Sequence, residues 1–102
     1  MKMDKQGRIT IPAEFLDEVK GLRETKTLYV YLIDYEKEAI EFMISPVERP
    51  RRNLFTKTKQ DAKHRICLNK IRIVWGTIVG SYNYVFLVRD HKLYLRGYKV
   101  SE

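Results

Sequence analysis

Two short stretches of the sequence carry basic residues in a setting that suits an anion. Residues 4–12 are Asp-Lys-Gln-Gly-Arg-Ile-Thr-Ile-Pro, and residues 61–69 are Asp-Ala-Lys-His-Arg-Ile-Cys-Leu-Asn. Guanidinium and ammonium groups bind phosphate oxygens, and the backbone N–H groups of a tight turn can add to such a site. The two stretches therefore predict an exposed phosphate-binding surface made by Lys5, Arg8, Lys63 and Arg65.

The residues around these side chains predict a turn, a short strand and the start of a helix. Gly7 can adopt a positive φ, so the chain can reverse beside it. Residues 8–11 alternate between polar and apolar, which is typical of a strand with one buried face. Pro12 suits the first position of a helix, and Asn69 in the second stretch is a good N-cap. Each stretch should therefore hold its arginine at the exposed side of a turn and strand.

The likeness between the two stretches continues along the chain. Gly21 and residues 29–33 recur as Gly76 and residues 84–88, and Ile40 and Phe42 then recur as Leu93 and Leu95. Matches in the same order predict two copies of one strand–helix–strand–strand unit. We expect a single domain of residues 1–102, with repeat one at 1–45, a connector at 46–53 and repeat two at 54–102.

The expected elements follow from periodicity and turn residues. Helices are predicted over residues 12–20 and 69–76, where apolar residues follow a helical spacing and a glycine ends each segment. Trp75 should pack in the core. Residues 27–33 and 84–88 should be strands buried on both faces, joined by turns at 34–38 and 89–91 to half-buried strands. The residues expected to point inward are Ile40, Phe42, Ile44, Ile66, Leu68, Leu93 and Leu95; those expected to point outward are Glu41, Met43, Arg65, Cys67, Lys92, Tyr94 and Arg96.

The charge of the chain is unevenly divided. Residues 1–44 hold seven basic and nine acidic residues, a net charge of −2, whereas residues 45–102 hold 13 basic and four acidic residues, a net charge of +9. A basic half favours a polyanionic partner, although a merely solvated surface would give the same imbalance. No apolar run approaches the length of a membrane helix, so no membrane partner is expected. We expect an intracellular, cytoplasmic protein.

Catalytic and metal-binding patterns are weak. His64 and Cys67 have an H-x-x-C spacing, but a structural metal needs about four ligands, and only His91 and scattered carboxylates remain. Cys67 occupies the strand position of Thr10, which indicates a small replacement rather than a nucleophile. We expect no enzymatic activity, no metal and no cofactor.

Residues 4–15, followed by Gly21-Leu22 and two strands, resemble the AbrB/MazE/SpoVT swapped-hairpin family, whose pattern begins D-x-x-G-R-I-x-I-P. Residues 82–98 resemble the end of the same unit. Family members usually carry one unit per chain and form an interleaved dimer that binds DNA. The resemblance implies a fused pseudo-dimer, a mostly β protein with short helices in which two intrachain repeats form an AbrB-like, eight-stranded or similar β-barrel.

The resemblance also implies DNA contacts. The arginine that follows the glycine in the family corresponds to Arg8 and Arg65, and the basic residues before the turn correspond to Lys2 in one copy and to Lys57 and Lys59 in the other. The arginines of the short helix correspond to Arg72, whereas repeat one departs from the family there with Leu16 and Asp17. His64 for glycine and Asn69 for proline are further departures.

We therefore expect a small non-enzymatic DNA-binding protein, a transcriptional regulator that grips duplex DNA near a pseudo-twofold axis. Backbone contacts would set the affinity, and one or two arginines would read guanine edges. The alternative is a protein-interaction module, antitoxin-like or an assembly partner, that binds an acidic protein. Pairing of two fused chains through exposed edge strands stays open. The predicted DNA-binding residues are Lys5, Arg8, Arg51, Arg52, Lys57, Lys59, Lys63, Arg65 and Arg72.

Overall fold

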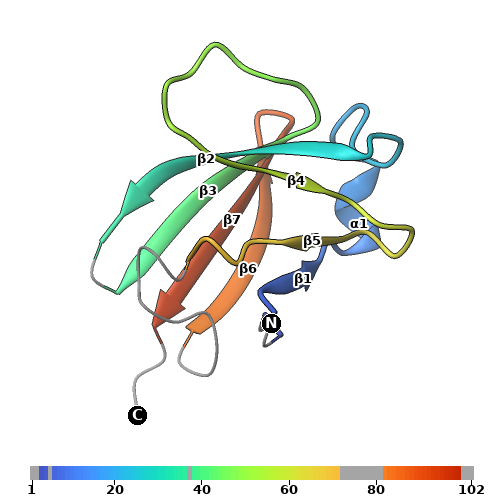
Figure 1. The fold of residues 1–102 in the computed structure, drawn as a ribbon. Helices are drawn as coiled ribbons and strands as arrows, with labels where there is room; N and C mark the ends of the chain where they lie inside the picture. The colour runs from blue at the N-terminus through green and yellow to red at the C-terminus, as the bar shows by residue number, and fades with distance from the viewer. Residues whose placement is uncertain (1–2, 5, 37, 72–81, 100–102) are drawn as a thin grey trace.

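The computed structural model describes residues 3–4, 6–36, 38–71 and 82–99 of the 102-residue chain (Figure 1). The described part is mostly β-structure, as the sequence predicts, and it contains one short helix. In chain order the elements are β1 (Arg8–Thr10), α1 (Ala13–Leu16), β2 (Thr27–Tyr35), β3 (Ala39–Ser45), β4 (Leu54–Lys59), β5 (Arg65–Cys67), β6 (Tyr82–Arg89) and β7 (Lys92–Lys99).

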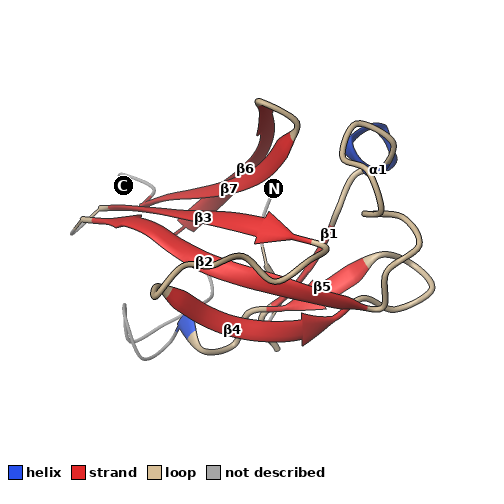
Figure 2. Ribbon diagram, turned by 90° about the horizontal axis from the view of Figure 1, so that it is seen from above, coloured by secondary structure: helices blue, strands red, loops and turns tan. Residues whose placement is uncertain are grey.

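Five strands form one antiparallel sheet in the order β4-β2-β3-β7-β6, which Figure 2 shows from β4 at the bottom to β7 and β6 at the top. β2 and β3 pair as one hairpin, and β6 and β7 pair as another. The two hairpins meet along β3 and β7, where Phe42 lies opposite Leu95. β4 adds to the other side of β2 through pairs that run from Thr27↔Lys59 to Tyr31↔Leu54. Most of the sheet is thus two hairpins placed side by side.

The turn between β6 and β7 is short. Asp90 and His91 have φ values of 50° and 61°, and Arg89 and Lys92 on either side are paired. Positive φ at both central residues is the mark of a two-residue hairpin turn whose twist matches that of the strands. The predicted turn at residues 89–91 is confirmed in place, and Arg89 itself belongs to β6.

β1 and β5 form a separate two-stranded antiparallel sheet, which we call the β1–β5 ribbon. Ile9 lies opposite Ile66, with Arg8 opposite Cys67 and Thr10 opposite Arg65. One side of the ribbon packs on the five-stranded sheet, and the hydrophobic core lies between the two layers. The predicted inward direction of four residues is confirmed, because all are at most 1% exposed: Ile66, Leu68, Leu93 and Leu95.

The described strands do not close into a barrel. Closure requires the first and last strands of a sheet to pair. The order of the larger sheet runs from β4 to β6, and these two strands are not hydrogen-bonded to each other. The mostly β class is therefore established, whereas the predicted eight-stranded barrel is not confirmed.

The first helix is shorter than predicted. α1 covers only Ala13–Leu16, and the chain then continues in turns, whose i to i+3 bonds join the N–H of Glu18 to the carbonyl of Phe15 and that of Leu22 to Val19. The buried residues Leu16, Val19 and Leu22 recur every three residues, which suits successive turns better than the 3.6-residue period of a helix. Gly21 has a φ of +83°, but the helix has already ended before it.

Burial differs from the prediction on the outer face of the sheet. Met43 is only 2% exposed, because the connector folds over the outer face, where the backbone of Arg49 hydrogen-bonds to the hydroxyl of Tyr31. Tyr31 itself is 1% exposed, which agrees with the predicted burial of both faces of residues 27–33. Met43 was expected to point outward into solvent. Val85 in β6 is 49% exposed, so the predicted two-sided burial of residues 84–88 is wrong.

The first predicted turn also differs, because β2 continues to Tyr35. A bulge after Leu32 shifts the register so that Asp34 pairs with Glu41 and Tyr35 with Ile40. The turn predicted at residues 34–38 is therefore shorter. The second predicted helix, from Asn69 to Gly76, lies largely outside the described residues, as does Trp75.

Candidate nucleic-acid interface

The turn before β1 is organised by Asp4. Its Oδ1 accepts the backbone N–H groups of Gln6 and Arg8, both at 2.9 Å, and its Oδ2 accepts the Nε–H of Arg8 at 2.7 Å. The N–H of Gly7 bonds to the carbonyl of Asp4 at 3.0 Å, and Gly7 has a φ of +81°. One carboxylate therefore closes the turn and also orients the arginine that follows it.

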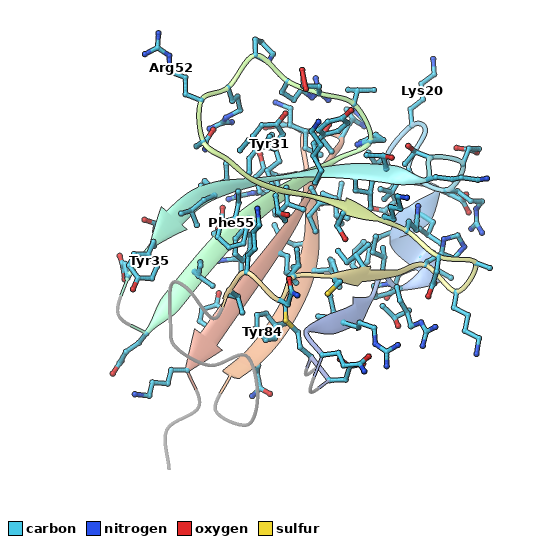
Figure 3. The ribbon with its side chains drawn as sticks, in the orientation of Figure 1. Lys20, Tyr31, Tyr35, Arg52, Phe55 and Tyr84 are labelled. Atoms are coloured by element: carbon cyan, nitrogen blue, oxygen red, sulfur yellow. The ribbon has the colours of Figure 1, made fainter. Side chains whose placement is uncertain are left out.

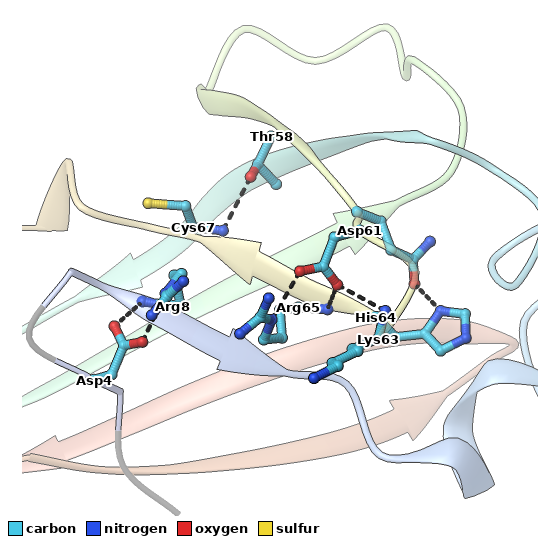
Figure 4. Close-up of polar contacts among 9 residues, drawn as sticks. Asp4, Arg8, Thr58, Asp61, Lys63, His64, Arg65 and Cys67 are labelled. Carbon is cyan, nitrogen blue, oxygen red and sulfur yellow. Dashed lines mark hydrogen bonds and ion pairs between the residues drawn. The ribbon is translucent and has the colours of Figure 1, made fainter.

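The turn before β5 has the same hydrogen bonds (Figure 4). Oδ1 of Asp61 accepts the N–H groups of Lys63 and Arg65 at 2.9 and 3.0 Å, and Oδ2 accepts the Nε–H of Arg65 at 2.7 Å. His64 replaces the glycine yet keeps a positive φ of 61°. Its Nδ1 lies 2.8 Å from Oε1 of Gln60, a residue only 8% exposed. This side-chain contact helps to hold a conformation that L-residues adopt rarely.

Further bonds link the two turns across the ribbon. The N–H of Leu68 donates to the carbonyl of Gly7 at 2.8 Å, and the N–H of Ile11 donates to the carbonyl of His64 at 2.9 Å. Alternation along the strands leaves four side chains on the face away from the core: Arg8, Thr10, Arg65 and Cys67. Arg8 and Arg65 occupy diagonal positions of the ladder, which typically lie about 7–8 Å apart. The structure thus brings the two predicted arginines together on one surface.

Both arginines are partly neutralised by their aspartates. The Arg8–Asp4 and Arg65–Asp61 pairs are exposed, with arginine side chains 41% and 37% accessible. The backbone N–H of Arg65, followed by its guanidinium, lowers the pKa of Asp61 from 3.8 to about 2, and the N–H of Arg8 is the main cause of a lowered pKa at Asp4. Because both pKa values lie below the ordinary 3.8, both aspartates are ionised at neutral pH and each offsets part of the charge of its arginine.

The other described residues that were predicted to contact DNA divide into three groups. Lys63 is exposed in the turn of the ribbon, close to Arg65 (Figure 4). Lys57 and Lys59 are exposed on β4, but the buried Thr58 between them faces the ribbon, so both lysines lie on the opposite, outer face of the sheet. Arg51 and Arg52 lie on the connector, and Figure 3 places Arg52 at the top of the molecule, away from the ribbon at the lower right. The structure does not bring these two arginines to the ribbon.

The remaining predicted contacts lie outside the described residues: Lys2, Lys5 and Arg72. In repeat one, Leu16 is 2% exposed and therefore belongs to the core. Asp17 instead accepts two hydrogen bonds from Arg23, at 2.9 and 3.0 Å. Within the described part of repeat one, this helix segment thus offers an acidic outer side rather than a basic one.

A second group of basic residues lies on the sheet, and none of its members was among the predicted DNA-binding residues. Arg89 of β6 and Arg96 of β7 both bind Glu41 of β3, at 2.9 and 3.0 Å. Tyr94 and Tyr98 lie beside them under the two guanidinium groups. The alternation Tyr94, Arg96, Tyr98 is visible in the sequence and marks one face of a strand. The contribution of Glu41 and Arg89 is visible only after the sheet is assembled.

Cys67 and His64 do not form a metal site with other residues. In the described part of the chain no group of three or more His, Cys, Asp or Glu side chains is placed to hold a metal ion. Sγ of Cys67 contacts the carbonyl of Gln6 at 3.4 Å, and its N–H donates to Oγ1 of Thr58 at 3.1 Å. Cys67 therefore packs beside the turn that precedes β1.

None of the helices in the described ranges has the length and apolar character needed to cross a membrane. Comparison with known proteins gives no relative from which a role could be transferred: no family model, curated protein or solved structure matches the chain.

Proposed function

We propose that the chain is a small DNA-binding protein, a transcriptional regulator that contacts duplex DNA through the β1–β5 ribbon. The observation that carries the proposal is the placement of Arg8 and Arg65 on the outward face of one short antiparallel ribbon. The major groove of B-DNA is wide enough to admit a two-stranded β-ribbon, and arginine is the commonest reader of guanine edges there. The ribbon therefore has a shape and a chemistry that suit this groove.

The fixed orientation of the arginines supports the same function. Each guanidinium is held by a bond from its Nε to its own aspartate. A preorganised guanidinium loses less conformational freedom when it binds. Lys63, exposed in the turn that precedes β5, would add a phosphate contact on the side of repeat two.

The correspondence between the two turns supports a fused pseudo-dimer. Every hydrogen bond that Asp4 makes has a counterpart at Asp61, and Ile9 pairs with Ile66 at the centre of the ribbon. In the larger sheet, Phe42 likewise pairs with Leu95. Both pairs join positions that the sequence repeat makes equivalent, as an approximate twofold axis between the halves would require. We propose that repeats 1–45 and 54–102 of an AbrB-like unit fold around this axis within one domain.

A titration of mixed-sequence duplexes, followed by gel mobility shift at 50 and 200 mM salt, tests the function. We expect a shifted complex at low salt that weakens strongly at the higher concentration, because phosphate contacts release counterions. The control is a chain with both ribbon arginines replaced, Arg8→Ala with Arg65→Ala. Absence of a shift at low salt, or equal binding by the double variant, contradicts the proposal.

A further inference from the structure

A second cationic surface lies on the face of the five-stranded sheet that points away from the core. The side chains of Leu93 and Leu95 are fully buried toward the core, so the alternate residues Tyr94, Arg96 and Tyr98 of β7 face the other way. Arg89 of β6 joins them. We call Arg89, Tyr94, Arg96 and Tyr98 the arginine–tyrosine platform. It lies on the opposite side of the sheet from the β1–β5 ribbon.

The platform consists of planar groups stacked on one another. The guanidinium carbon of Arg89 is 4.4 Å from the ring centroid of Tyr94, and that of Arg96 is 5.3 Å from the centroid of Tyr98. On β2 and β4, Lys57 lies 5.9 Å from the ring centroid of Tyr29 on the same face. Significant cation–π contacts occur roughly once per 70–80 residues. Three on one sheet face of a small protein are therefore a concentrated feature.

Glu41 holds the two guanidinium groups in place. Its side chain is only 13% exposed, and its two oxygens accept from Arg89 and Arg96 separately. One carboxylate between two arginines leaves one net positive charge. Arg89 and Arg96 are still 55% and 42% exposed, so the outer planes and remaining N–H groups of both guanidinium groups are open to a ligand.

We propose that the arginine–tyrosine platform binds single-stranded nucleic acid. Unpaired bases stack on tyrosine rings and on guanidinium planes, and cationic side chains between the rings bind the phosphates. The exposed ring of Tyr98, the half-buried ring of Tyr94 and the guanidinium groups here supply the stacking surfaces, and Arg89, Arg96 and the nearby Lys92 supply the charge. A duplex keeps its bases stacked internally, so it gains nothing from such rings. The proposal is independent of duplex binding at the ribbon.

Fluorescence anisotropy with labelled oligo-dT and oligo-U tests the platform, because neither strand forms a duplex with itself. We expect Tyr98→Ala to weaken binding about fivefold or more, as loss of one stacked base does, while Tyr98→Phe, which keeps the ring, stays within about twofold. Arg89→Gln should weaken binding, whereas Lys20→Gln, which removes an equal charge at an exposed site elsewhere, should not. Oligo-U and oligo-dT separate an RNA ligand from a DNA ligand.

Circular dichroism and thermal melting should first show that each variant is folded. Equal binding by wild type and Tyr98→Ala, or no binding of either oligonucleotide, overturns the platform. Arg65→Ala must leave oligo-dT binding within about twofold of wild type. A loss equal to that seen with duplex DNA would place the single strand on the ribbon and would also overturn the platform, without affecting the duplex proposal.

Discussion

Ile9 lies directly opposite Ile66 at the centre of the β1–β5 ribbon, and both side chains are buried, at 4% and 1% exposure. The two residues come from equivalent positions in the two similar stretches of sequence. Because the two strands are antiparallel and both isoleucines point toward the core, Arg8 and Arg65 lie on the same outward face. A hydrophobic contact at the centre of the ribbon therefore fixes the relative placement of the two arginines.

The position of Arg65 on the ribbon predicts that replacing it weakens duplex binding. Replacing Arg65 with Ala should weaken duplex binding by about tenfold, roughly 1.4 kcal/mol, because one base or phosphate contact is lost. Lys92→Ala is the matched control, since it removes the same charge from an exposed position on the sheet. We expect it to stay within about twofold of wild type in anisotropy titrations. Equal losses in the two variants would argue against the ribbon as the contact surface.

The salt dependence predicts how many phosphates the protein neutralises. If the basic residues contact roughly five phosphates, a plot of log K against log salt should have a slope of about −4 to −5. Arg65→Ala should make the slope less steep by about one if that side chain contacts a phosphate. Isothermal titrations at four or more salt concentrations give the slope. A value near zero would mean that phosphates do not contribute, and duplex binding would then need another explanation.

The two turn aspartates predict a loss of stability in acid. Their pKa values are lower in the folded chain than the ordinary value of 3.8, and that of Asp61 falls to about 2. A carboxylate with a depressed folded pKa stabilises the fold above its unfolded pKa, and this contribution disappears as the pH falls toward the folded value. The melting temperature should therefore drop between about pH 4 and pH 2.

Replacing Asp61 with Asn tests the origin of that drop. The amide keeps an acceptor oxygen but cannot ionise, so the variant should melt lower at pH 7 and lose less stability in acid. Asp34→Asn, at an exposed position on β2, serves as the control and should follow the wild-type profile. Identical profiles for wild type and Asp61→Asn would show that the turn carboxylate does not contribute.

Replacing Gly7 or Gly21 with alanine should lower the free energy of unfolding by unequal amounts, although both glycines have a similar positive φ. Gly7 and Gly21 have φ values of +81° and +83°. A Cβ at Gly7 would lie 2.9 Å from the backbone N and Cα of Asn69, whereas one at Gly21 would lie 3.9 Å from Pro46. Gly21→Ala should cost about 1–2 kcal/mol of unfolding free energy from the left-handed conformation alone, and Gly7→Ala should cost clearly more. Urea denaturation measures both, and equal values would contradict the close approach of the two stretches.

Local patterns in the sequence were sufficient for the short-range structure. The turn of Asp61 to Arg65 is held by hydrogen bonds within five successive residues, so its residue types specify it directly. The two-residue turn at Asp90 and His91 is also a local feature, and the strand that follows it alternates between core and solvent. In the second turn His64 has the positive φ that Gly7 has in the first turn, and its side chain contacts Gln60.

Long-range packing decided the rest. Met43 is buried because the connector returns over β3, which the alternation within that strand does not reveal. Arg89 and Arg96 meet Glu41, some 50 residues away, only because β3 and β7 pair at the centre of the sheet. The sequence by itself determined the two aspartate turns, the hairpin turn at residues 89–91 and the outward direction of Arg8 and Arg65, since these depend on neighbouring residues. The order of the strands, the open sheet and the stacked platform required the tertiary structure, because they depend on which distant segments the core brings together.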